Sequence, residues 1–235
     1  MSRWLDVGTA FLSTLARVGT GLRVGPLGAR PARPLELYEF EACPFCRKVR
    51  EALSILDLEA IIYPCPKGGP TFRPRVRELG GRELFPYLVD PNTGKAMYES
   101  SDIVAYLFAE YGDGRVPAPL ALGPVTDLSS VFAGLARLGA GSRYRRARAP
   151  AQPLELYSFE ASPFCRLVRE TLTQLELPYL LHNVAKGSPK RDAFVRLSGK
   201  MMVPYLVDPN TGAAMFESAE ITAYLERTYG ADERA

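Results

Sequence analysis

The stretch PLELYEFEACPFCRKVREALSILDLEAIIYPCPKG, residues 34–68, recurs without gaps as PLELYSFEASPFCRLVRETLTQLELPYLLHNVAKG at residues 153–187. After a length difference of one residue, PYLVDPNTGKAMYESSDIVAYLFAEYG (86–112) matches PYLVDPNTGAAMFESAEITAYLERTYG (204–230). Similarity between two long segments of one chain indicates that a structural unit occurs twice. The sequence therefore predicts two modules of the same architecture.

The first half of each copy has the pattern of a strand, a helix and a second strand. In the first copy, apolar residues alternate over 35–40, a helix follows from Pro44, and a second apolar strand covers 60–63. We expect the buried face of the helix to carry four apolar side chains: Phe45, Val49, Leu53 and Leu56. A right-handed crossover makes the two strands parallel, so their carboxyl ends share one edge of the sheet.

The second half has the pattern of a hairpin and a closing helix. A short helix is expected near 75–79, and strands at 87–89 and 96–98 flank the turn sequence DPNTG at 90–94. A final helix is expected over about 101–111. Each module is therefore predicted to be mixed α/β, with the order βαβ followed by ββα.

The repeat extends upstream of both modules. FLSTLARVGTGLR (11–23) is similar to VFAGLARLGAGSR (131–143), and both are amphipathic at helical spacing. Since a transit peptide has no reason to recur in mid-chain, we interpret both as helices that cover a module face; a weak contact of the N-terminal helix with a membrane or partner is the alternative. The predicted division of the chain is an N-terminal amphipathic helix and connector at 1–33, a first module at 34–114, a linker helix and basic connector at 115–152, and a second module at 153–235.

Composition restricts the class of protein. Hydrophobic residues make up 47% and charged residues 23% of the chain, which is typical of a folded globular protein. The net charge of +3 gives no argument for nucleic-acid binding, and the basic stretch at 143–148 has the pattern of a solvated linker. No apolar run has the length of a transmembrane span, and no secretory signal is recognisable, so we expect a cytoplasmic protein.

The cysteines point to redox chemistry rather than to a disulfide scaffold or a metal centre. Cys43 and Cys46 form a C-x-x-C motif, which in a protein without an export signal indicates redox work or metal binding. His182 is the only histidine and no second C-x-x-C is present, which is a poor ligand set for zinc. We therefore predict no metal site.

Cys43 is the predicted nucleophile. It lies between the first strand and Pro44, where the free N–H groups and the dipole of the helix favour a thiolate. Cys46, three residues later on the same helical face, can resolve a mixed disulfide held on Cys43. The prediction requires Cys43 to be accessible and close to Pro86; a buried Cys43 would leave only the duplicated fold.

Two further cysteines are assigned differently. Cys65 ends the second strand at the same sheet edge as Cys43, so we consider it as an additional redox thiol, against the simpler interpretation of a small apolar residue at a strand end. In the second copy, Ser162 replaces the nucleophile and leaves Cys165 without a partner. We interpret Cys165 as a packed thiol.

Three features together resemble a known family. The sequence CPFCRKVR at 43–50, a proline that opens a strand at Pro86, and Glu99-Ser100 before the last helix are similar to the glutaredoxin-like N-terminal domain of glutathione transferases, in the thioredoxin superfamily. The resemblance covers most of both copies. It implies an α/β fold of two tandem thioredoxin-like modules, each βαβ-ββα with a preceding amphipathic helix.

The resemblance also implies glutathione as cosubstrate. In that family the proline is cis, the residue before it pairs with the cysteinyl backbone of glutathione, and the Glu-Ser pair binds the γ-glutamyl end; a lysine after the second strand would reach the glycyl carboxylate. A serine in place of the nucleophile either stabilises a glutathione thiolate or caps its helix. The implicated residues are Phe85, Pro86, Glu99, Ser100 and Lys67 in the first copy, and Ser162, Val203, Pro204, Glu217 and Ser218 in the second.

The predicted function is a glutathione-linked thiol–disulfide oxidoreductase that acts on small or protein disulfides. Cys43 is the nucleophile, Cys46 resolves, and the second module is a degenerate glutathione- or partner-binding copy. One alternative is a glutathione transferase or isomerase, although each copy brings only one short helix in place of that family's helical C-terminal domain, and such an enzyme needs an apolar pocket between the modules. The other is a non-enzymatic adaptor that binds glutathione or an iron–sulfur cluster.

Overall fold

The computed structural model describes residues 20–121 and 141–231. The predicted upstream helices, at 11–23 and 131–143, lie almost wholly outside these ranges, and so does the suggested contact through the N-terminal helix. No helix within the described ranges is long and apolar enough to cross a membrane.

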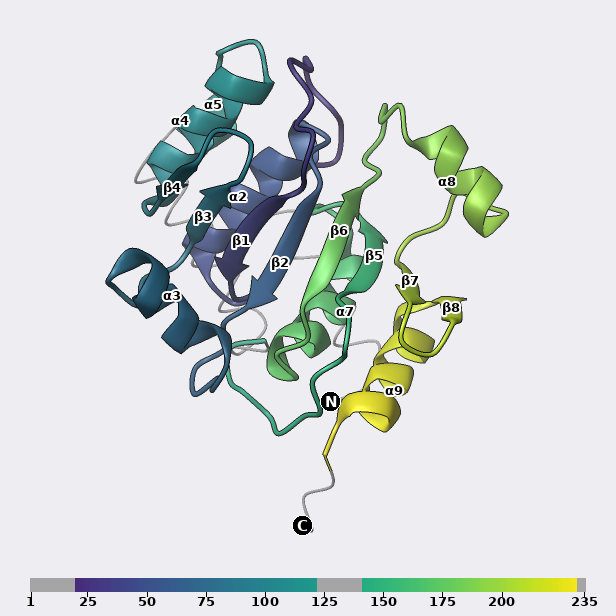
Figure 1. Cartoon of the computed structure of the whole chain (residues 1–235). Coiled ribbons are helices and arrows are strands. Elements are labelled where there is room, and N and C mark those ends of the chain that lie inside the picture. Colours follow the sequence, from purple (N-terminus) through teal and green to yellow (C-terminus); the bar gives the residue numbers. More distant parts are fainter. Residues whose placement is uncertain (1–19, 122–140, 232–235) are drawn as a thin grey trace.

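The predicted order of elements is confirmed in both modules (Figure 1). The first module consists of β1 (Leu35–Glu39), α2 (Pro44–Ile55), β2 (Ala60–Pro64), α3 (Phe72–Gly80), β3 (Tyr87–Asp90), β4 (Lys95–Met97), α4 (Ser100–Tyr111) and the short α5 (Ala118–Ala121). The second consists of β5 (Leu154–Ser158), α7 (Pro163–Gln174), β6 (Tyr179–Asn183), α8 (Arg191–Ser198), β7 (Tyr205–Asp208), β8 (Ala213–Phe216) and α9 (Ser218–Tyr229). Helix α3 is longer than the helix near 75–79 that the sequence predicted.

The two modules share one eight-stranded sheet with the order β4-β3-β1-β2-β6-β5-β7-β8. Within each module the first two strands are parallel, as the crossover predicts. The modules join through β2 and β6, which pair antiparallel with Ile61 opposite Leu180. Because these strands run in opposite directions, the carboxyl ends of β1 and β5 lie at opposite ends of the sheet. The two copies therefore have no common cleft at those ends.

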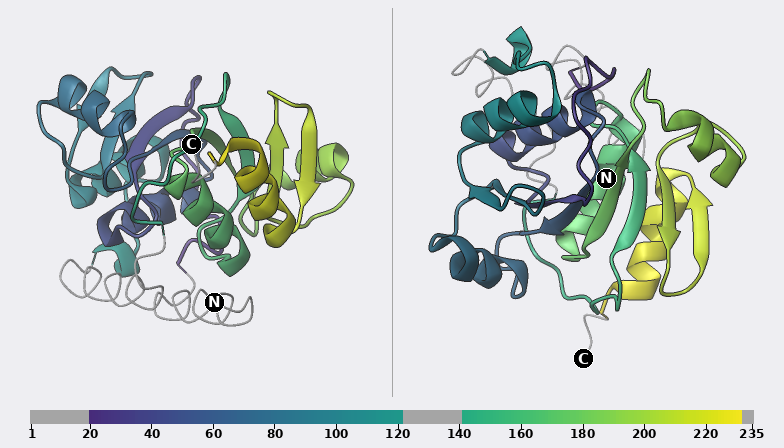
Figure 2. Two further views of the ribbon diagram at one scale, coloured as in Figure 1. Left: turned by 90° about the horizontal axis from the view of Figure 1, so that it is seen from below. Right: turned by 45° about the horizontal axis from the view of Figure 1, so that its top comes forward.

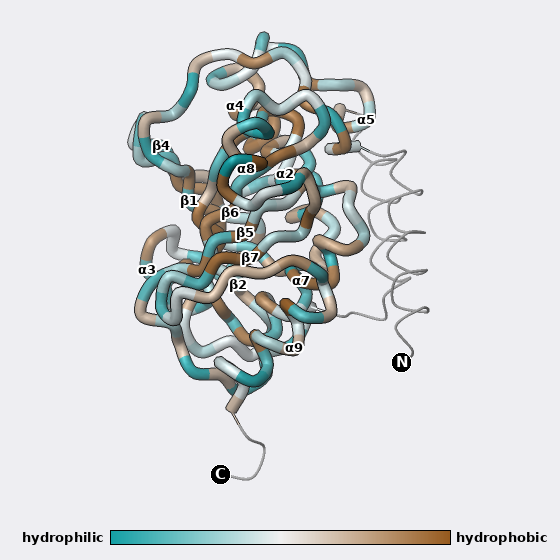
Figure 3. Tube along the Cα trace, turned by 90° about the vertical axis from the view of Figure 1, so that its right-hand side faces the viewer, coloured by the Kyte–Doolittle hydropathy of each residue, from teal (hydrophilic) through white to brown (hydrophobic). Residues whose placement is uncertain are grey.

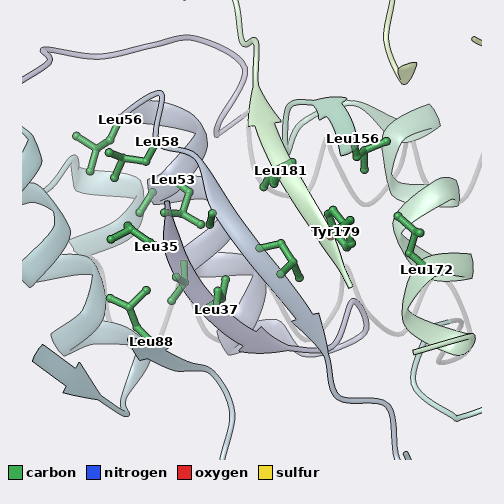
Figure 4. Packing of buried hydrophobic residues seen from close by; sticks show 14 of the residues in the cluster. Leu35, Leu37, Leu53, Leu56, Leu58, Leu88, Leu156, Leu172, Tyr179 and Leu181 are labelled. Atoms are coloured by element: carbon green, nitrogen blue, oxygen red, sulfur yellow. The ribbon is translucent and has the colours of Figure 1, made fainter. Parts of the chain in front are cut away.

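One hydrophobic cluster runs through both modules. Leu37 of β1 and Leu53 of α2 belong to it together with Leu156 of β5 and Leu172 of α7, and all four are fully buried (Figure 4). In Figure 3 hydrophobic segments follow the central strands, and in Figure 2 α7 and α9 lie along the same side of the sheet. A fully buried leucine contributes about 1.5–3 kcal/mol, so this continuous core stabilises the pair of modules as one body.

The connectors cross between the modules. The backbone N–H and C=O of Lys186 pair with Leu22 and Val24, which precede the first module. In the same way, the backbone of Lys67 pairs with residues 142–144, which precede the second module. Each connector therefore adds hydrogen bonds to the module that it does not lead into.

A buried cluster of charges also spans the junction. Arg50 and Arg169 each contact both Glu41 and Glu160 at 2.9–3.1 Å, and each of these side chains is 3% exposed or less. Burial opposes ionisation of Glu41 and is the largest influence on it, but Arg169 and Arg50 outweigh it and lower the pKa to about 2. Removal of one partner from a buried ion pair destabilises the folded state, because the other charge stays buried without a counter-charge. These four side chains therefore favour the arrangement of the modules in which each charge is paired.

Replacing one arginine of this cluster is expected to destabilise the whole chain. In Arg169→Met the buried carboxylates of Glu41 and Glu160 lose a counter-charge, so the free energy of unfolding should fall by about 3–5 kcal/mol in urea titrations. The control is Arg77→Met, which removes a pair with Glu83 from a side chain that is 67% exposed, and it should change stability by about 1 kcal/mol at most. Equal effects of the two variants would contradict the role of the cluster.

Candidate functional site

The C-x-x-C motif forms the first turn of α2. Cys43 is the N-cap residue, with extended backbone angles, and its sulfur accepts a hydrogen bond from the Cys46 backbone N–H at 3.2 Å. Pro44 occupies the first helical turn, where its missing N–H has no role. The predicted capping position of Cys43 is confirmed.

The two thiols of the motif have opposite tendencies to ionise. Burial is the largest influence on Cys43 and opposes ionisation, but hydrogen bonds from the Cys46 thiol and backbone N–H lower its pKa below the usual value. Burial, followed by donation of its proton toward Cys43, raises the pKa of Cys46 well above the usual value. The pair therefore favours a thiolate on Cys43 and a neutral thiol on Cys46.

Two expectations about exposure are wrong. Cys43 is only 4% exposed, because its sulfur turns inward to cap the helix. Phe45, predicted on the buried face of α2, is 44% exposed, and its ring lines a surface pocket rather than the core. By the condition stated from the sequence, this burial counts against Cys43 as the nucleophile, so the redox role is kept only as a proposal that depends on local opening of the first turn of α2.

That pocket collects four of the five predicted glutathione-binding residues of the first module, and none of its cysteines. It holds about 170 Å³ and is lined by Phe45, Leu84, Phe85, Pro86, Tyr98, Glu99 and Ser100. The Phe85–Pro86 peptide bond is cis, as the resemblance implied. Lys67 is exposed and does not line the pocket, and its backbone is engaged by the connector.

The backbone is strained where α4 begins. Glu99 has φ of 66° and ψ of 110°, a left-handed conformation that side chains other than glycine rarely adopt. Glu217 repeats it before α9, with φ of 67°. Strain of this kind persists where the surroundings impose it, often at functional sites. It lies beside the start of α4, whose N–H groups attract an anion.

Aromatic side chains connect Cys43 to the cis-proline loop. Phe40, three residues before Cys43, meets the ring of Phe85 edge-on with centroids 6.1 Å apart. The Arg73 guanidinium lies 4.8 Å from the Phe85 centroid and binds Glu83 at 2.7 Å. The sequence did not identify Arg73 as a residue near the site, because an arginine in an amphipathic helix does not indicate which group its side chain contacts.

Comparison with protein-family models identifies the family of both modules. Residues 37–115 and 156–233 each match the family model described as "Glutathione S-transferase, N-terminal domain". The chain belongs to this family. A solved structure entitled "Leishmania TDR1 - a unique trimeric glutathione transferase" is 15% identical over 83% of this chain and 68% of that chain, with a TM-score of 0.30. A TM-score that low does not bear on the arrangement of the modules.

The second glutathione transferase-type module repeats the pocket without the nucleophile. Its pocket holds about 260 Å³ and is lined by Phe164, Met202, Val203, Pro204, Glu217 and Ser218, with the Val203–Pro204 bond cis. Ser162 caps α7, its hydroxyl accepting from the Cys165 N–H at 3.3 Å. Burial raises the pKa of Cys165.

The structure does not bring Cys65 into the Cys43–Cys46 pair. Its side chain packs with Tyr38, Phe72 and Val76, in a cluster separate from the one that contains α2. Burial raises the pKa of the Cys65 thiol well above the usual value. The role of Cys65 as an additional redox thiol therefore gains no support from its position. Within residues 20–121 and 141–231, no group of three or more potential metal ligands is found.

Removal of the Cys46 thiol should make Cys43 harder to ionise. In Cys46→Ala the Cys43 thiolate keeps the backbone N–H but loses the S–H donor, so its pKa should rise. The ultraviolet absorbance of the thiolate, followed against pH, measures the shift. Cys165→Ala is the matched control and should not change the pKa of Cys43. An unchanged titration curve in Cys46→Ala would show that the hydrogen bond from the Cys46 thiol does not lower the pKa of Cys43.

Proposed function

We propose that this chain is a glutathione-linked thiol–disulfide oxidoreductase in which Cys43 is the nucleophile and Cys46 resolves. The observation that carries the proposal is the asymmetric thiol pair, because hydrogen bonds lower the pKa of Cys43 while Cys46 keeps its proton. The thiolate is the attacking form in disulfide exchange. Membership of the glutathione transferase N-terminal family supports glutathione as the cosubstrate.

The pocket of the first module is the place we assign to glutathione; Phe45 of the C-x-x-C motif lines it, and the two cysteines of the motif do not. We assign the backbone of Phe85 to the cysteinyl part, and Glu99, Ser100 and the start of α4 to the γ-glutamyl end, whose carboxylate suits the free N–H groups there. Lys67 is left out of the assignment because it lies outside the pocket. These roles follow the family pattern residue by residue.

The reaction begins with attack of the Cys43 thiolate on the glutathione sulfur of a mixed disulfide. A bond forms between these sulfurs, the substrate thiolate leaves, and water protonates it. A second glutathione, or Cys46, then displaces the bound glutathione from Cys43. Since Cys43 is 4% exposed, the first step includes local opening of the first turn of α2, and openings at helix ends need less free energy than global unfolding.

The junction between the modules favours this function over conjugation of an apolar electrophile. Such a reaction needs an apolar pocket for its second substrate, and the described residues place Arg50, Arg169, Glu41 and Glu160 at the junction. We assign the modules to 34–114 and 153–235, and we assign to the second a role in binding glutathione or a partner. The chemistry suits a reducing compartment such as the cytoplasm.

Replacement of the nucleophile tests the proposal directly. Cys43→Ser should reduce turnover of a small glutathione mixed disulfide to the uncatalysed background, because a hydroxyl does not ionise as a thiol does. Cys165→Ser, at the inner position of the second module, should retain full activity. Turnover is followed through the oxidised glutathione that forms; activity that survives in Cys43→Ser would exclude this function.

Glutathione binding by the second module is tested through a matched pair of serines. Ser100→Ala and Ser218→Ala each remove one hydroxyl at the start of the last helix, and each should weaken one of two sites by about 1 kcal/mol, roughly fivefold. Titration calorimetry with glutathione separates the two sites. If Ser218→Ala leaves the titration unchanged while Ser100→Ala weakens it, the second module does not bind glutathione.

A further inference from the structure

Helix α3 of the first module begins without a cap of its own. Its N-cap residue, Thr71, makes no side-chain hydrogen bond to the helix, and the first turn of α3 contains no acidic residue. The first N–H groups of a helix have no partner within the helix, so they need an acceptor from elsewhere. For α3 that acceptor comes from the second module.

The carboxylate of Glu176 caps the start of α3. Its Oε1 accepts hydrogen bonds from the backbone N–H groups of Thr71 and Phe72, both at 3.1 Å, and its Oε2 accepts from Thr71 at 3.3 Å. Glu176 lies in the turn between α7 and β6. Because β6 pairs antiparallel with β2, this turn lies at the end of the sheet where β2 leads into α3 (Figure 1). A carboxylate at a helix N-terminus is favourable both as an acceptor and toward the helix dipole.

The local structure around Glu176 is costly, which indicates that the contact is under constraint. Glu176 has φ of 50°, in the left-handed region that residues other than glycine rarely adopt. Burial is the largest influence on its pKa and raises it, although the N–H groups of Phe72 and Thr71 lower it. A Cβ atom added to Gly69 would lie 2.6 Å from Oε1 of Glu176, so the glycine leaves the space that the carboxylate occupies.

The start of α3 supports the cis-proline loop of the first pocket. Arg73, the residue after Phe72, binds Glu83 at 2.7 Å, and its guanidinium lies 4.8 Å from the ring centroid of Phe85. Phe72 packs in the same hydrophobic cluster as Phe85. Since Phe85 and Pro86 line the pocket, two consecutive residues at the capped end of α3 contact the loop that forms one of its walls.

The second module does not depend on the first in the same way. Ser188 stands where the first module has Gly69, and its hydroxyl accepts from the Lys190 N–H at 3.1 Å, while an acidic residue lies in the first turn of α8. Asp57 corresponds to Glu176 and has φ of 52°. Its carboxylate is one methylene shorter and contacts the side chains of Ser188 and Lys190 instead. Of these two corresponding helices, α3 is the one capped by the other module.

We propose that Glu176 is a positioning residue for the pocket of the first module. By capping α3 it holds Arg73 in place and, through Arg73, the cis-proline loop against which glutathione binds. The identity of the ligand rests on the proposed function, whereas the coupling from Glu176 to the loop rests on the contacts above. The second module thus completes the site of the first, whether or not it binds a ligand of its own.

A comparison of binding with thiol reactivity tests the inference. Glu176→Ala should raise the KM for a small glutathione mixed disulfide about fivefold, the usual effect of a lost helix cap, because the loop that receives glutathione loses its support. The rate at which iodoacetamide alkylates Cys43 should stay unchanged, since the cap of α2 is not altered. Asp57→Ala removes the corresponding carboxylate of the first module and is the matched control, which should change neither quantity.

A double-mutant cycle shows whether Glu176 acts through Arg73. In the Arg73→Met background, Glu176→Ala should change the KM little further, because the connection to the loop is already lost. If Glu176→Ala does not fold, Glu176→Gln, which keeps one acceptor oxygen, should give a smaller increase in the KM of the same kind. The inference is overturned if a folded Glu176 variant keeps the natural KM, or if the effects of Glu176→Ala and Arg73→Met add in full.

Amide hydrogen exchange separates failure of this inference from failure of the proposed function. In Glu176→Ala, exchange should become faster at residues 71–73 and also at residues 83–85 of the cis-proline loop, and it should stay unchanged at residues 201–203 of the second module. Natural exchange at 83–85 in that variant would overturn the inference. If the natural sequence does not turn over a glutathione mixed disulfide, the proposed function fails, and exchange at 83–85 still decides whether Glu176 positions the loop.

Discussion

The antiparallel pairing of β2 with β6 determines most of what this molecule can do. It joins two units of mixed parallel and antiparallel strands through β2 and β6, so the duplicated modules form one sheet and one core. It also turns the carboxyl ends of β1 and β5 away from each other. Ligand sites of such modules form at those ends, and the two described pockets have no lining residue in common.

Three of the differences between the copies lie at the ends of the first two strands and at the start of the helix between them. Glu39, Cys43 and Cys65 in the first module correspond to serine, serine and valine in the second. The scaffold around them is retained, including the cis peptide before the proline and the positive φ before the last helix. One copy therefore holds ionisable groups at these positions, and the other holds a corresponding pocket with a serine that caps the helix.

The sequence predicted the elements because periodicity, proline and turn residues act locally, and the gapless repeat confirmed each assignment against a second copy. It did not predict the junction, because an edge strand such as β2 has the same alternation whether it faces water or another strand. The charges at Arg50 and Arg169 have the pattern of a solvated helix face, and only the partner module buries them. The burial of Cys43 was missed for a related reason: a cap position fixes the backbone, not the direction of the sulfur.

The buried charges give the second module a role in the chemistry of the first, whether or not it binds a ligand. Arg50 pairs at once with Glu39 and with Glu160, which the second module supplies. Glu160 raises the pKa of Glu39 directly and also competes for its counter-charge. The second module also supplies Arg169, whose charge lowers the pKa of Glu39, so its two charged groups act on that carboxyl group in opposite directions. The duplicated module is therefore part of the electrostatic environment of the first site.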